Sequence, residues 1–150
     1  MPARRRDDAV PPCGSDDLAV VVHWEPDGTG LRGQVIAENV SGQICQLANK
    51  PTVTPLQPDG SPLPVETIVT MEMRSPGYVN LQPGQRAAAP VSWGSWCGQQ
   101  ASDQARVEWP GGSTTARVDG PTQPDCDPSQ GYNLTSSWFD LIERPGRPTV

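Results

Sequence analysis

Short apolar segments alternate with turn sequences along most of the chain. In residues 18–24 (LAVVVHW), every second position from Leu18 to Trp24 is apolar, so these side chains share one face of an extended strand. After the turn EPDGTG, residues 31–40 alternate in a similar way. The two segments therefore predict a β-hairpin.

Further short segments with the same character predict more strands. TVTPL contains a proline, which favours the edge of a sheet. QARVEW and TTARV, separated by PGGS, form the clearest hairpin in the chain. These additional strands are predicted at residues 44–47, 52–56, 64–74, 86–93, 104–109 and 114–118.

Turn signals recur at intervals of roughly 8 to 12 residues, which is typical of a β-sandwich or a barrel. One short segment breaks the pattern. In residues 136–143, Ser137 and Asp140 resemble the capping box at the start of a helix. The remaining pattern predicts an all-β domain.

Composition indicates a sparse core that needs covalent support. Leu, Ile, Val and Phe together number 27, whereas proline and glycine contribute 18 and 15 residues. The chain also contains four cysteines, at positions 13, 45, 97 and 126. They lack the close pairs that zinc sites use, and an even number of widely spaced cysteines is typical of disulfides formed in an oxidising compartment. The residues alone allow three pairings.

Charge and hydropathy exclude several classes of protein. The net charge of −6 argues against nucleic-acid binding, which needs a basic surface. No segment reaches the roughly 18 apolar residues of a membrane span. The first 17 residues lack the apolar region of a signal peptide, so no export signal is visible. Residues 1–12, with three arginines followed by two aspartates, predict a disordered leader.

Several motifs occur in an order that resembles a known family. CGSDDLAV contains Cys13, ENVSGQICQLANKPTV contains Cys45, and a D-G turn precedes LQPGQRAAAPVSWGSWC, which ends at Cys97. Over residues 13–126 this order is similar to a secreted actinobacterial four-cysteine domain of unknown function, found in lipoproteins and cell-envelope proteins. Two features depart from that family: Asn49 stands where glycine is common, and VPPC lacks the pattern of a lipid-attachment site.

The resemblance implies a fold and a disulfide pairing, but no activity. It implies an immunoglobulin-like sandwich, here of seven to eight short antiparallel strands, with Cys13 joined to Cys45 and Cys97 joined to Cys126. The domain would occupy residues 13–126, followed by a partly docked tail at 127–150. Its location would be secreted or in the cell envelope.

Candidate catalytic and metal-binding groups are sparse in the sequence. The single histidine, His23, alternates outward from its apolar neighbours, and the carboxylates at 16–17, 125 and 127 flank cysteines and turns. Met71 and Met73 carry soft thioethers that could bind Cu(I), but no histidine or cysteine adjoins them. We expect core packing for these methionines. The sequence thus predicts no catalytic residue, no metal site and no cofactor.

The tryptophans offer the most informative candidate contacts. Trp24, Trp93 and Trp109 each extend an apolar strand face, which predicts core positions. Trp96 lies in the loop GSWCG, where it could contact a ligand or pack on the adjacent disulfide. Trp138 and Tyr132 follow the last cysteine, and they could contact a partner or dock along the domain. A ligand site, where one exists, is predicted near Trp96.

The leading hypothesis for function is a non-catalytic, extracytoplasmic binding or structural module of the bacterial cell envelope. Its partner would be an envelope protein or a glycan. The first alternative is a glycan-binding module that uses the loop and tail aromatics. A hydrolase ranks below both, because the histidine and the carboxylates form no recognisable catalytic pattern.

Overall fold

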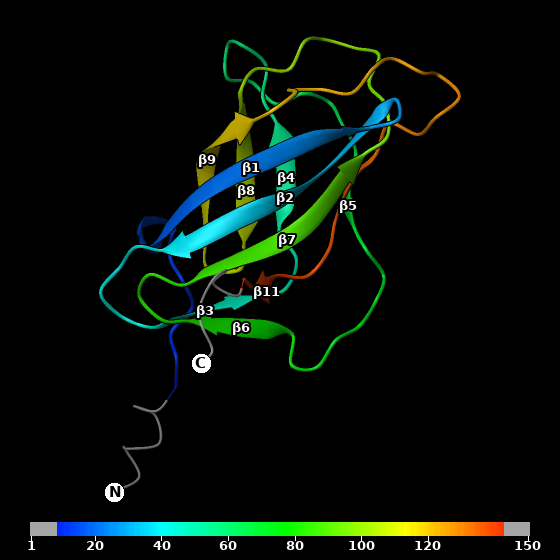
Figure 1. Cartoon of the computed structure of the whole chain (residues 1–150). Coiled ribbons are helices and arrows are strands. Elements are labelled where there is room, and N and C mark those ends of the chain that lie inside the picture. Colours follow the sequence, from blue (N-terminus) through cyan, green and yellow to red (C-terminus); the bar gives the residue numbers. More distant parts are fainter. Residues whose placement is uncertain (1–8, 143–150) are drawn as a thin grey trace, which may run out of the picture.

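The computed structural model describes residues 9–142 and shows an all-β protein with two disulfide bonds (Figure 1). No α-helix occurs within these residues, so none could cross a membrane. A 3-10 turn at Ser15–Asp17 precedes eleven strands. They are β1 Leu18–Asp27, β2 Gly30–Asn39, β3 Cys45–Ala48, β4 Thr52–Pro55, β5 Thr67–Val69, β6 Tyr78–Leu81, β7 Arg86–Trp93, β8 Gln104–Trp109, β9 Gly112–Asp119, β10 Leu134–Ser136 and β11 Asp140–Leu141.

Nine strands form one sheet that curls into a nearly closed barrel. The strand order is β4-β8-β9-β1-β2-β7-β10-β5, with β11 also paired to β7. Strands β4 and β5, at the two ends of this order, come into contact. Strands β3 and β6 form a separate antiparallel pair, which lies below the barrel in Figure 1.

The all-β class is confirmed, but the arrangement is not clearly the predicted immunoglobulin-like sandwich. Two pairings, β1 with β9 and β10 with β5, are parallel, whereas the prediction was fully antiparallel. Alternation along a strand identifies its buried face without identifying its neighbours. The parallel pairs join segments far apart in the sequence, which no local pattern reveals.

Strong alternation located the central strands well. The predicted hairpin of residues 18–24 and 31–40 is β1–β2, with Leu18 opposite Asn39 and Asp27 opposite Gly30. The predicted second hairpin is β8–β9. Strand β4, which contains Pro55, lies at one end of the strand order as predicted. Trp24, Trp93 and Trp109 are all buried in the core.

Two local predictions are wrong. The predicted strand at 64–74 is reduced to β5, and the predicted helix at 136–143 is replaced by β10, a short connection and β11. The two capping-box side chains have other partners: the Ser137 hydroxyl donates to the Glu72 carboxylate at 2.6 Å, and Asp140 pairs with Arg74. Pairing with β7 also satisfies backbone groups that a helix would bond internally.

The segment predicted as a docked tail contributes to the barrel itself. Leu134 and Phe139 are buried in the core, and β10 lies between β7 and β5. Residues 143–150 of that segment lie outside the described residues, as do residues 1–8 of the predicted leader. Pro12, at the end of the leader, bridges to Gln46 on β3.

One end of the barrel, which we call the closed end, holds the Cys13–Cys45 disulfide. Both of these cysteines are buried. The indole Nε1–H of Trp109 donates to the Cys13 carbonyl at 2.9 Å. Nearby, the fully buried Asn39 donates to the Leu81 carbonyl at 2.8 Å. Polar groups at the closed end are therefore buried with partners.

Candidate functional site

The opposite end of the barrel, which we call the open end, is built from three loops. They are the β1–β2 turn and residues 94–103 and 120–133, which lie at the upper right of Figure 1. The Cys97–Cys126 disulfide joins the second loop to the third, so both pairings implied by the family resemblance are confirmed.

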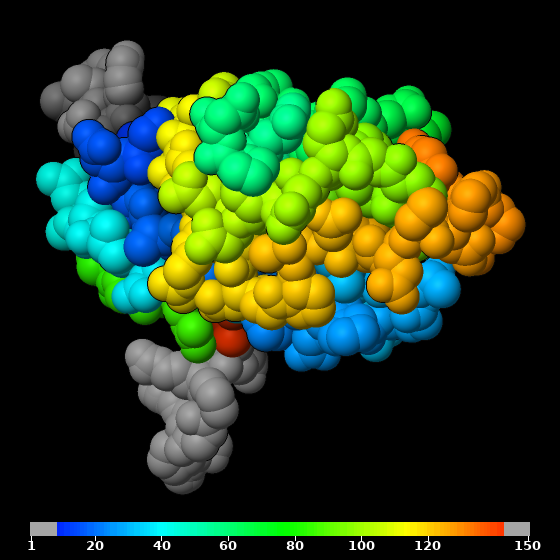
Figure 2. All heavy atoms as spheres, turned by 90° about the horizontal axis from the view of Figure 1, so that it is seen from above, coloured from blue at the N-terminus to red at the C-terminus, as the bar shows by residue number. Residues whose placement is uncertain are grey.

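Backbone hydrogen bonds reinforce this disulfide. The Asp125 N–H donates to the Thr29 carbonyl at 2.9 Å, and the Trp96 N–H donates to the Asp125 carbonyl at 3.3 Å. Figure 2 shows the gold and orange chain around residues 120–130 against both the blue β1–β2 hairpin and the lime-green segment before residue 100. Residues from three parts of the sequence are thus held together.

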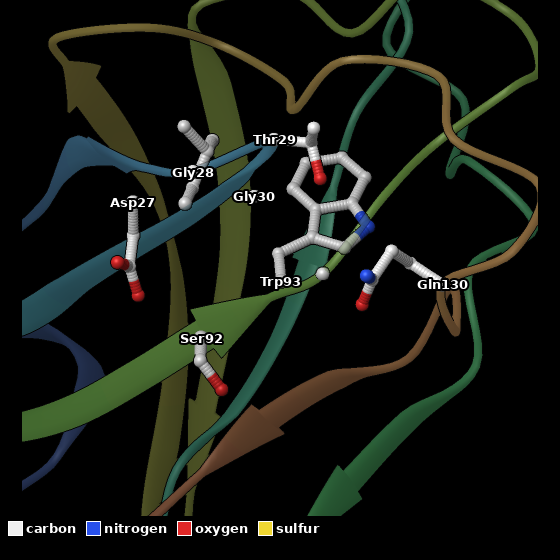
Figure 3. A pocket seen from close by; sticks show the side chains of 9 residues that line it. Asp27, Gly28, Thr29, Gly30, Ser92, Trp93 and Gln130 are labelled. Carbon is white, nitrogen blue, oxygen red and sulfur yellow. The ribbon is translucent and has the colours of Figure 1, made fainter.

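A recess of about 310 Å³ lies between these loops (Figure 3). Its rim offers a carboxylate, two hydroxyls and a carboxamide. The lining residues are Asp27, Gly28, Thr29, Gly30, Leu31, Ser92, Trp93, Gly94 and Gln130. The recess is therefore mostly polar, with one aromatic side chain.

Two glycines allow the walls of the recess to approach each other. A Cβ atom on Gly30 would lie 2.8 Å from the Gly94 and Trp93 carbonyl oxygens, and one on Gly94 would lie 2.9 Å from the Gly131 carbonyl oxygen. Both distances are shorter than van der Waals contact, so any side chain would push the loops apart. The shape of the recess depends on these two positions.

Trp93, which lies behind the recess, carries an unusual buried donor. Its side chain is 0% exposed and packs between Trp24 and Trp96, with 6.2 Å between ring centroids in each pair. Within residues 9–142 its Nε1–H has no hydrogen-bond partner, although buried donors are normally paired and an unpaired one costs about 1–3 kcal/mol. In Figure 3 the indole nitrogen lies on the side of the Gln130 carboxamide.

Trp96, the predicted contact residue, has no indole face available to solvent. Its side chain is 6% exposed, and its Nε1–H donates to the Gln99 carbonyl at 2.6 Å. The neighbouring Gly98 allows this burial, because a Cβ there would lie 2.5 Å from the Trp96 ring. The glycine lets the backbone cover the indole instead of presenting it.

The structure separates the other two predicted aromatics. Tyr132 packs edge-on against Trp96, with ring centroids 5.9 Å apart, and stays 37% exposed beside the recess loop. Trp138 instead lies with residues 70–77, where its Nε1–H donates to the Glu72 carbonyl and the Lys50 ammonium lies 4.8 Å from its ring centroid. Of the three predicted contact residues, Tyr132 and Trp96 lie at the open end and Trp138 does not.

The candidate catalytic groups are not assembled around a common point. His23 is partly exposed on β1, and its Nε2 lies 3.1 Å from the Glu25 carboxylate. Asp17 accepts a hydrogen bond from the Gly14 N–H, and Asp127 accepts from Ser129; both bonds are local turn contacts. Within residues 9–142, no group of three His, Cys, Asp or Glu side chains could hold a metal ion.

The sequence predicts core packing for Met71 and Met73, and this prediction is wrong. Their side chains are 92% and 91% exposed. The strand that would have turned them toward the core ends at Val69. Beyond it, the backbone runs over the surface of the barrel.

Sequence reasoning missed the residues that form the recess. The EPDGTG segment indicated only a turn, and Ser92 and Gln130 carried no recognisable signal. Glycines and small polar residues gather in many loops. Their meeting here depends on the Cys97–Cys126 bond, which brings Gln130 toward the β1–β2 turn.

A comparison with known families extends this description. The sequence profile described as Domain of unknown function (DUF4232) matches residues 13–136, from the first cysteine through β10. No curated protein and no solved structure matches the chain. Because the matched range covers most of the chain and both disulfides, this protein belongs to the DUF4232 family of domains of unknown function.

Proposed function

We propose that this domain is a non-catalytic binding module that acts outside the cytoplasm, in the bacterial cell envelope, and takes its ligand in the open-end recess. The observation that carries the proposal is the Nε1–H of Trp93, which is fully buried behind a polar recess and has no partner among the residues that the structure describes. A ligand atom that accepts this hydrogen bond would remove the cost of the unpaired donor. The two disulfides support an oxidising location.

The chemistry of the rim favours a hydroxyl-rich ligand such as a glycan. Asp27 can accept hydrogen bonds, while the Thr29 and Ser92 hydroxyls and the Gln130 carboxamide can both donate and accept. A sugar ring presents donors and acceptors in similar alternation. Tyr132, exposed on the same loop as Gln130, offers an aromatic surface at the edge.

Rigid loops would lower the entropy lost on binding. Besides the disulfide, Ser95 crosslinks the two loops: its hydroxyl donates to the Asp127 carbonyl at 3.0 Å and accepts from the Asp127 N–H at 2.8 Å. The Gln123 side chain also accepts from the Ala101 N–H at 2.7 Å. The rim is therefore held in place before a ligand arrives.

The lining of the recess favours binding over hydrolysis. Glycoside hydrolysis ordinarily requires two carboxyl groups facing the scissile bond. Among the nine lining residues, Asp27 alone carries a carboxyl group. His23, the sole histidine, is not among them.

The Trp93 indole proton provides a direct test in the purified, oxidised domain. We would titrate soluble envelope glycans and follow the five tryptophan indole signals by proton–nitrogen NMR, assigning Trp93 from its loss in Trp93→Phe. Binding should move the Trp93 signal downfield, as a new acceptor approaches. Trp93→Phe, which keeps an aromatic ring and removes the donor, should weaken binding about tenfold, the effect of one hydrogen bond.

A matched pair of glutamine variants locates the site independently. Gln130→Ala should weaken binding, whereas Gln100→Ala, also exposed but outside the recess, should not. Glycan binding with an unmoved Trp93 signal and equal affinities for both glutamine variants would place the site elsewhere. If an envelope protein binds to the same residues and no glycan does, the recess is the binding site but its ligand is a protein.

A further inference from the structure

Met71 and Met73 project from a surface segment whose opposite side is firmly attached. The Lys50 ammonium donates to the Thr70 and Glu72 carbonyls. The Glu72 carboxylate accepts from the Ser137 hydroxyl at 2.6 Å. Two thioethers are therefore exposed on a backbone that other residues fix on both sides of position 72.

The two methionines flank a residue whose side chain is anchored. Glu72 accepts the hydrogen bond from Ser137, and Met71 and Met73 on either side of it are 92% and 91% exposed. Positions two residues apart span at most about 7 Å along a chain, and each unbranched thioether side chain has three rotatable bonds, so both sulfurs can reach one point between them.

The charges around this pair suit a cation of low charge. Arg74 is neutralised by Asp140, with 2.6 Å between the guanidinium and the carboxylate. The Lys50 charge lies on the inward side, over the Trp138 ring. Glu72 adds one negative charge nearby, and the whole chain carries a net charge of −6.

We propose that Met71 and Met73 form a chelating site for a soft monovalent cation, Cu(I) or Ag(I). Thioethers are neutral, polarisable ligands that select such ions over hard cations such as Mg²⁺ or Ca²⁺. Once one sulfur binds, the second binds intramolecularly at a high effective concentration. This site is independent of the open-end recess, since neither methionine lines it.

Silver provides the test, because it requires no reductant and the disulfides stay intact. The purified oxidised protein would be titrated with silver nitrate in chloride-free buffer, by calorimetry and by NMR of the methionine methyl groups. We expect one ion per chain, with the Met71 and Met73 methyl signals shifting together. Met71→Leu and Met73→Leu, each a fully exposed and conservative change, should each weaken the affinity at least tenfold.

Two further variants separate this site from background binding. Met71→Leu/Met73→Leu retains the third methionine and His23, so it measures all other silver binding. His23→Gln should leave the affinity unchanged. Two independent ions per chain, single variants that merely halve the stoichiometry, or an unchanged affinity in the double variant would each overturn the proposal.

Discussion

The two ends of the barrel use the same crosslink in opposite environments. Cys13 and Cys45 are 32 positions apart and buried, whereas Cys97 and Cys126 are 29 positions apart and exposed. On the chain-entropy model, both loops contribute about 3.7 kcal/mol. The entropic contributions are therefore equal, and the difference between the ends lies in what surrounds each bond.

At the closed end, polar groups are paired, while at the open end one is not. Asn39 makes four hydrogen bonds: its amide donates to the Gln43 and Leu81 carbonyls, and its oxygen accepts from the Ser41 N–H and hydroxyl. The Trp93 donor has no partner in the described part of the chain. The closed end thus resembles an optimised core, and the open end retains a donor that a ligand, a water molecule or a rearrangement can satisfy.

The largest expected difference comes from removing each disulfide. Cys97→Ala/Cys126→Ala should lower the free energy of unfolding by about 4 kcal/mol, through loop entropy alone. Cys13→Ala/Cys45→Ala should lower it by about 1–2 kcal/mol more, because it also leaves a cavity in a packed region. Urea unfolding of both variants measures the difference. Equal values would show that burial at the closed end adds no stability.

Asn39→Ala should cost about 3 kcal/mol, because it leaves the Leu81 carbonyl buried without that donor and removes the other bonds of Asn39. Asn133→Ala, an exposed position on an open-end loop, serves as the control and should cost less than about 0.5 kcal/mol. Thermal unfolding of the pair compares the ends directly. A similar loss of stability in both variants would contradict the proposed difference in polar pairing between the two ends.

Two tryptophan variants isolate the effect of one indole donor. Trp109→Phe removes the bond to the Cys13 carbonyl, whereas Trp93→Phe removes a donor without a partner among residues 9–142. The ring area lost is the same, so Trp109→Phe should be more destabilising by about 1–2 kcal/mol. Chemical denaturation without ligand tests this, and the reverse order would mean that the Trp93 donor is satisfied in solution.

The smallest effect concerns a surface charge near the open end. The hydrogen bond from Arg117 holds the pKa of Asp119 below its ordinary value of 3.8. The associated stabilisation is present above about pH 3.8 and is lost as the pH falls through the lower folded value. Arg117→Gln should raise the Asp119 pKa in an NMR titration. It should leave Asp59 unchanged, because the Ser61 hydroxyl lowers that pKa.

The sequence predicted elements with a strong local signal. Alternation of apolar positions located β1 and β8, and the ordered cysteine motifs implied the disulfide pairing. Loop geometry gave no comparable signal. The sequence GSWCG left open whether Trp96 contacts a ligand or packs on the disulfide, and in the structure Gly98 lets the backbone cover the ring. Alternation at Met71 and Met73 continued past the residue where β5 ends, because local pattern carries no information about where a neighbouring strand stops.

The position of β10 determines when the barrel can close. Among the described strands, β5 is paired by hydrogen bonds with β10 alone, and β10 lies between it and β7. Residues 67–69 therefore cannot pair into the sheet until residues 134–136 are present. The β1–β2 hairpin, by contrast, can form as soon as its own residues are available. Such a long separation in sequence slows folding. A chain emerging from a ribosome or a translocation pore would complete its barrel only after Ser136 has emerged.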